Sequence, residues 1–150
     1  MLEKIQADVK EALKSKDELE VSTLRMLLAA IKNFEISRGQ AGYQATEPEI
    51  VSQVQKEIKS RKEAIEQFKV GGRQDLVDKE TKEIKVLEKY LPEQINEQEL
   101  RKTVTESISE ASASSISDLG RVIGLVMSKV KGRAEGSVVS QIVKEELSKK

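Results

Sequence analysis

The stretch from Thr46 to Pro92 reads TEPEIVSQVQKEIKSRKEAIEQFKVGGRQDLVDKETKEIKVLEKYLP and contains two long helical patterns. Its apolar residues recur at spacings of three and four on both sides of Gly71-Gly72, as they do in amphipathic α-helices. The glycine pair ends the first helix, and Pro92 ends the second. Because the connection is short, the second helix has to run back along the first. The stretch therefore predicts a long antiparallel helical hairpin.

The tetrapeptide Thr46-Glu47-Pro48-Glu49 indicates where this hairpin begins. The hydroxyl of Thr46 can accept a hydrogen bond from a first-turn amide, and Glu49 can reach back to the amide of Thr46. Pro48 removes only a donor that lacks a partner in the first helical turn. We therefore expect a capping box at Thr46 and a helix that starts directly after it.

The rest of the chain carries the same apolar spacing in shorter segments, and no strand-like alternation extends beyond a few residues. After Pro92 the segments become shorter and serine becomes frequent. We expect an all-α protein with a helical N-terminal domain at residues 1–92 and a three-helix tail domain at residues 93–150. The additional helical segments are residues 2–13, 21–36, 100–108, 119–130 and 138–147.

The composition excludes several classes of active site. The 150 residues include 26 basic and 26 acidic side chains, and neither histidine nor cysteine. The chain therefore has no imidazole base, no thiolate nucleophile, no disulfide and no histidine or cysteine ligand for zinc. The apolar run Met26–Ile31 is far shorter than the roughly 20 residues that span a bilayer. We expect a soluble cytoplasmic protein without a cofactor, a metal ion or a membrane partner.

No arrangement of residues predicts catalysis, but two charged residues lie beside apolar stripes. Arg25 follows Leu24 on the flank of one stripe, and Glu80 lies between Val77 and Ile84 on another. A partly buried charge needs a partner. The two residues could belong to structural ion pairs, with each other or with further residues, or Arg25 could line a binding groove between the helices.

The tail has local clusters of charge and of glycine. It holds nine basic and nine acidic residues and no aromatic one, which argues against base stacking. The cations Arg121, Lys129, Lys131 and Arg133 are less diluted by acids and lie before or within a turn that precedes a helix N-terminus, which attracts phosphate. This cluster could contact RNA or form a solvated surface. Gly120 and Gly124 predict close approach of a neighbouring helix.

Several segments together resemble the GatB/YqeY family, specifically its stand-alone YqeY-like members. Their order and spacing match over nearly the whole chain, from about Leu2 to Leu147. The segments that carry the resemblance include Leu24–Leu27, Ala30–Asn33, Gly72–Leu76, Tyr90–Pro92, Gly120–Met127 and Gly132–Gly136.

The resemblance implies a helical N-terminal domain and a smaller helical tail. The same module ends the B subunit of the tRNA-dependent amidotransferase, which amidates Glu-tRNA(Gln) or Asp-tRNA(Asn). There the tail contacts tRNA, and the chemistry resides elsewhere. The family's carbon-nitrogen ligase association, with glutamine as amido-N-donor, is therefore not expected of this chain alone.

By resemblance, the expected partners are tRNA and the amidotransferase or another tRNA-handling protein. The candidate tRNA contacts are Arg121, Lys129, Lys131, Arg133 and Lys144. The leading hypothesis is a non-catalytic, tRNA-associated helical adaptor. The alternative is a protein-interaction module without a nucleic-acid role, which would dock through the long hairpin at residues 47–91.

Overall fold

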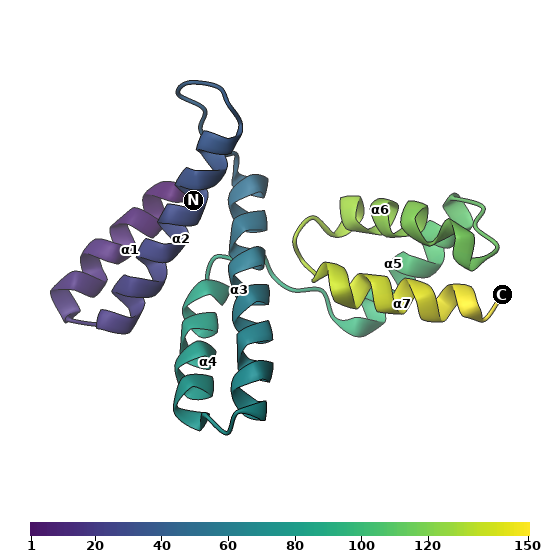
Figure 1. Ribbon diagram of the computed structural model, residues 1–150. Helices are drawn as coiled ribbons and strands as arrows, with labels where there is room; N and C mark the ends of the chain where they lie inside the picture. The colour runs from purple at the N-terminus through teal and green to yellow at the C-terminus, as the bar shows by residue number, and fades with distance from the viewer. The chain divides into compact units, whose positions relative to one another are not determined.

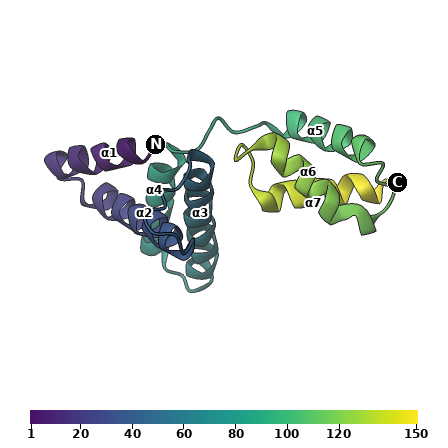
Figure 2. The same cartoon turned by 90° about the horizontal axis from the view of Figure 1, so that it is seen from above.

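The computed structural model describes all 150 residues and contains helices but no strand, which confirms the all-α prediction (Figure 1, Figure 2). The chain divides into an N-terminal unit, Met1–Leu91, and a C-terminal unit, Pro92–Lys150. None of the helices combines the length and apolar character needed to cross a membrane. The elements are α1 (Leu2–Ser15), α2 (Glu18–Ser37), α3 (Glu47–Val70), α4 (Gln74–Glu88), α5 (Glu97–Glu110), the 3-10 turn η1 (Ile116–Asp118), α6 (Leu119–Val130) and α7 (Gly136–Ser148).

The start of α3 contains the predicted capping box. The amide of Glu49 donates to the hydroxyl of Thr46 at 3.4 Å, and the amide of Thr46 donates to the carboxylate of Glu49 at 2.8 Å. The hydroxyl of Tyr43 also donates to this carboxylate at 2.7 Å. These bonds, first of all the one from the Thr46 amide, lower the pKa of Glu49. The local sequence thus fixes both the helix start and the loop that precedes it.

The glycine pair connects α3 to α4, and the two helices run antiparallel side by side (Figure 1). Gly72 has a φ of +69°, a conformation that L side chains rarely adopt. The amide of Arg73 then donates to the carbonyl of Phe68 at 2.9 Å, which closes the turn. A bulkier residue at position 72 would strain this connection.

Helices of the N-terminal unit share one apolar core. Leu24 and Leu27 from α2, Val54 from α3 and Leu87 from α4 are fully buried in it. Tyr90, directly after α4, is also buried, and its hydroxyl donates to the carboxylate of Asp8 on α1. Burial first, and then this hydrogen bond, raise the pKa of the Tyr90 phenol. The start of the chain is thereby tied to the end of α4.

The C-terminal unit has its own core, which is rich in valine. Val104, Val122, Val126 and Val139 are fully inaccessible to solvent. The side chain of Asn96 caps α5, accepting from the amide of Glu99 at 2.8 Å. These residues bring α5, α6 and α7 together around one centre.

The last two helices of this unit begin without a side-chain cap. Asp118 does not cap α6 with its side chain, because its carboxylate accepts from the amide of Ser114 at 3.0 Å and so closes the preceding η1 turn. The last helix begins at Gly136, two residues before the expected segment 138–147, and has Glu135 at its N-cap position. Both starts therefore lack a side-chain cap of their own.

Gly120 and Gly124 do not mark a helix–helix contact, contrary to the expectation from their spacing. Both are exposed, and a Cβ built on either would meet no atom within 4 Å outside its own surroundings in the helix. The buried face of α6 is formed instead by Val122, Val126 and Val130. The two glycines are one turn apart on the opposite, solvent-facing side, so packing within this unit does not require them.

Replacing Gly124 by alanine is expected to raise the free energy of unfolding by about 0.5–1 kcal/mol, because alanine loses less backbone entropy in a helix. Urea denaturation followed by circular dichroism measures this change. Gly72→Ala is the contrasting variant, since its φ of +69° should make the same substitution destabilising by about 1–2 kcal/mol. A destabilising Gly124→Ala would contradict the open space seen at α6.

Candidate functional site

The turn between α6 and α7 presents Lys131 in an unusual backbone conformation. Lys131 has φ 44° and ψ 56°, a left-handed conformation that helix ends usually give to glycine. Its amide donates to the carbonyl of Met127 at 3.1 Å. Its side chain is exposed and makes no ion pair or hydrogen bond. A strained, unpartnered cation in the turn between α6 and α7 is a candidate contact for an anion.

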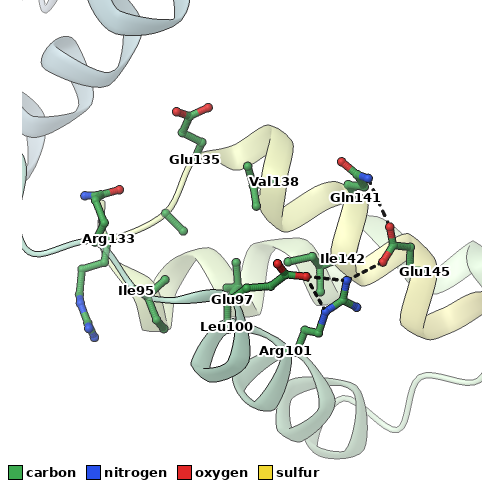
Figure 3. A pocket seen from close by; sticks show the side chains of 12 residues that line it. Ile95, Glu97, Leu100, Arg101, Arg133, Glu135, Val138, Gln141, Ile142 and Glu145 are labelled. Carbon is green, nitrogen blue, oxygen red and sulfur yellow. Dashed lines mark hydrogen bonds and ion pairs between the residues drawn. The ribbon is translucent and has the colours of Figure 1, made fainter. Parts of the chain in front are cut away.

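Arg133, two residues later, holds the turn to the start of the unit. Its Nε donates to the carbonyl of Glu93 at 3.0 Å, and its own carbonyl accepts from the amide of Ile95 at 2.9 Å. Gln94 adds a bond from its side-chain amide to the carbonyl of Gly132 at 3.3 Å. In Figure 3 the side chain of Arg133 points away from α7. This arginine therefore has a structural role in the turn.

Two other candidate cations are paired with acids of the same unit. The guanidinium of Arg121, in the first turn of α6, donates to Asp118 at 3.0 Å. The ammonium of Lys129, in the last turn, donates to Glu110 on α5 at 2.6 Å. Hydrogen bonds from the amide of Ser114 first, and then from the amide of Ser115 and the guanidinium of Arg121, lower the pKa of Asp118 and favour its charged form. Each pair reduces the positive potential that a phosphate would meet.

The fifth candidate, Lys144, is an exposed residue of α7 without an ion pair or hydrogen bond of its side chain. The structure thus separates the five cations into three kinds. Lys131 and Lys144 are free, Arg121 and Lys129 are neutralised locally, and Arg133 is bound to a backbone carbonyl. Four of the five cations are close together in the sequence, but their different contacts in the structure do not make them one group.

A groove of about 410 Å³ lies between α5 and α7 and was not found from the sequence (Figure 3). Leu100, Val138 and Ile142 form its apolar part. Along it, Arg101 on α5 donates to Glu145 at 2.9 Å and to Glu146 at 3.1 Å on α7. The guanidinium of Arg101 also contacts the carboxylate of Glu97, one turn earlier on α5, at 3.0 Å.

The charged side chains beside the groove are paired with one another. The hydrogen bond to Glu145, and then the one to Glu97, raise the pKa of the Arg101 guanidinium. The same bond lowers the pKa of Glu145. Both groups are therefore held in their charged forms, as expected of a structural network. The i,i+4 spacing of Glu97 and Arg101 is the sequence signal for part of it.

The buried ion pair of the N-terminal unit is formed by Arg61 and Glu83, not by Arg25 and Glu80. The Nε of Arg61 donates to Glu83 at 2.9 Å, and both side chains are buried. Arg61 also donates to Glu57 at 2.8 Å. Arg25 is exposed instead, and Glu80 is partly buried, with a pKa raised by burial and by the nearby Glu83.

Helical register explains why Arg61 is buried. Arg61 follows Ile58 by three positions and precedes Ile65 by four, so it lies on the apolar face of α3 that packs against α4. This spacing was readable in the sequence, but the many Lys and Glu residues of the hairpin obscured it. Arg25 is on the outer side of α2, where no helix of this unit covers it.

The acids of the chain form no metal-binding arrangement: no group of three or more acidic side chains is placed to hold a cation. The geometry is that of a helical scaffold with a few free cations and several surface hollows.

Comparison with known proteins extends these observations to a family. The model of the Yqey-like protein family matches residues 2–147. A relative from Pyrenophora tritici-repentis, named Altered inheritance of mitochondria protein 41, mitochondrial, is 35% identical, covering 97% of this chain and 80% of the relative.

Relatives with the same name occur in two other organisms. The one from Saccharomyces cerevisiae (strain ATCC 204508 / S288c) is 37% identical over 87 residues, which are 58% of this chain and 46% of the relative. The one from Clavispora lusitaniae is 27% identical and covers 87% of this chain and 74% of the relative. The matches confirm the resemblance to stand-alone YqeY-like proteins. Since the family match covers almost the whole of both units, the chain belongs to the family of Yqey-like proteins.

Proposed function

We propose that the chain is a non-catalytic helical adaptor that associates with tRNA through exposed lysines of its C-terminal unit. The observation that carries this proposal is Lys131, which keeps its ammonium unpartnered at a turn where glycine would be less strained. Lys144 supplies a second free cation on α7. The resemblance to the tRNA-contacting tail of the amidotransferase B subunit supports the same assignment.

Charge balance sets the strength expected of this interaction. The C-terminal unit has as many acidic as basic residues, and two of the candidate cations are paired. Binding should therefore be weak and should fall steeply with salt, because it depends on a few phosphate contacts. Shape and backbone contacts, rather than base stacking, would position the tRNA, since this unit has no aromatic residue.

The test is the binding of bulk tRNA across a salt series, comparing the natural chain with Lys131→Gly combined with Lys144→Ala. Each lost phosphate contact should reduce the slope of log affinity against log salt by about 1. Glycine at position 131 suits the left-handed conformation, so weaker binding would not result from unfolding. Lys102→Ala, at an exposed residue of α5, is the matched control. An unchanged slope in the double variant, or no binding at low salt, would refute the proposal.

The second candidate function is a protein-interaction module without a nucleic-acid role. The pairing of Arg121 with Asp118 and of Lys129 with Glu110 favours it, because it leaves few cations for phosphate. A protein complex that persists after nuclease treatment, together with absent tRNA binding at low salt, would support this candidate over the first.

An accessory role in tRNA-dependent amidation is part of the proposal. Adding the purified chain to a reconstituted amidotransferase reaction should change the amidation of tRNA-bound glutamate or aspartate, and no change would count against the role. We propose a cytoplasmic location for this chain, whereas the names of its relatives refer to mitochondria. A fluorescent fusion at the C-terminus distinguishes the two compartments.

A further inference from the structure

Arg25 is the only one of the seven arginines without a partner in the chain. The others bind carboxylates, a backbone carbonyl or aromatic rings. Those contacts are Arg38 with Phe34 and Tyr43, Arg61 with Glu83, Arg73 with Asp75, Arg101 with Glu145, Arg121 with Asp118, and Arg133 with the carbonyl of Glu93. A free guanidinium offers a planar fork of donors that matches a carboxylate.

Arg25 lies at the edge of a groove of about 630 Å³ at the α1–α2 corner. Ala12 and Val21 form the apolar floor and are buried, while Leu13 is 49% exposed. Leu13 thus adds one exposed apolar side chain at the side of the hollow. The remaining lining residues are Lys16, Glu18, Ser22 and Arg25.

The outer face of α2 continues this groove along the helix. Glu18, Ser22, Arg25 and Ala29 follow one another at spacings of four, three and four, so they lie on one line. All four are exposed. Because Ser22 and Ala29 are small, a second helix can approach α2 at the roughly 8–10 Å typical of helix packing.

The charges of the residues that line the groove indicate which kind of partner would bind there. Lys16 and Arg25 are its cations, Glu18 is its single acid, and none of the three makes an ion pair, so the lining is net positive. An apolar floor with cations at its edge is complementary to an amphipathic helix that carries carboxylates beside its apolar face. Arginine is one of the residues enriched among those that contribute most to the binding energy of interfaces.

We infer that the α1–α2 groove is a docking site for an acidic amphipathic helix of a partner protein. Leu13 and Val21 contact the apolar side chains of that helix, and Arg25 binds one of its carboxylates. The site lies wholly in the N-terminal unit and involves none of the lysines assigned to tRNA. It therefore goes beyond the proposed function and does not depend on it.

The experiment measures binding of three fluorescent helical peptides by anisotropy. Each has about 18 residues and the same leucine face, flanked by glutamate, glutamine or lysine. The glutamate peptide should bind at least tenfold tighter than the lysine peptide. Arg25→Glu should weaken its binding by about tenfold or more and reduce the preference for acidic flanks. Leu13→Asp should weaken all three peptides.

Two matched controls separate docking from general effects of charge and polarity. Lys59→Glu makes a comparable charge reversal at an exposed residue of α3, and Val70→Asp changes an apolar residue that is 91% exposed. Both should bind the peptides as the natural chain does. Circular dichroism should show that all four variants remain folded, since each replaced residue is exposed.

Several results would overturn the inference. These are equal binding of the glutamate and lysine peptides, no binding of the glutamate peptide, or an equal loss in the control variants. A natural chain that dimerises while Arg25→Glu is monomeric would assign the groove to a second copy. Loss of tRNA binding in Arg25→Glu with peptide binding unchanged would assign it to nucleic acid.

Discussion

Replacing Arg61 by alanine is expected to lower the free energy of unfolding of the N-terminal unit by about 3–5 kcal/mol. The substitution leaves the carboxylate of Glu83 buried without its main partner, since Arg61 donates to it at 2.9 Å and both side chains are no more than 7% exposed. Lys79, at 3.9 Å and 58% exposed, is too distant and too solvated to replace the guanidinium. Urea denaturation followed by circular dichroism measures the loss.

The exposed ion pair of Arg73 and Asp75 provides the control. Its side chains are 59% and 65% exposed, so Arg73→Ala should change stability by less than about 1 kcal/mol. Replacing both buried partners, as Arg61→Met with Glu83→Leu, should cost less than Arg61→Ala alone, because no buried charge is then left unpaired. A loss in Arg61→Ala no larger than in Arg73→Ala would contradict the structural role of the buried pair.

Replacing Leu24 by alanine should be comparably damaging, with a loss of about 2.7–5 kcal/mol. Leu24 is fully buried in the core of the N-terminal unit, where its removal leaves a cavity. The size of the loss depends on how far the surrounding side chains can close that cavity. Thermal and urea denaturation of the purified variant give the change directly.

Leu13→Ala is the matched substitution on the neighbouring helix. Its side chain is 49% exposed, so the same chemical change should cost clearly less than at Leu24. The pair of variants therefore also distinguishes stability from docking, because only Leu13 belongs to the proposed docking groove as an exposed residue. Equal losses at the two leucines would mean that Leu13 is covered in the folded chain in solution.

Local sequence alone was sufficient for the existence of the helices and for some of their ends. The capping box at Thr46 forms as expected, because it involves residues only three positions apart. The glycine pair at residues 71–72 likewise makes a tight connection through its own backbone conformation. The all-α class follows from the same short-range periodicity.

Charged contacts could not be predicted in the same way, because they depend on which helix faces come together. Arg61 and Glu83 are 22 positions apart, and Arg101 and Glu145 are 44 apart. Helical spacing places each residue on a face of its own helix, but the partner depends on how the helices pack and in what register.

The candidate site also combines features that the sequence predicts with features that only tertiary packing decides. The sequence supplied the cations Lys131, Lys144 and Arg25, and a correct family, but their environments arise from tertiary packing. Folding leaves Arg25 beside a groove without a partner, whereas it binds Arg133 to the carbonyl of Glu93. Periodicity therefore determines helices and buried stripes, since it acts within a few residues. Packing between distant segments determines which charges are neutralised and which remain available for a partner.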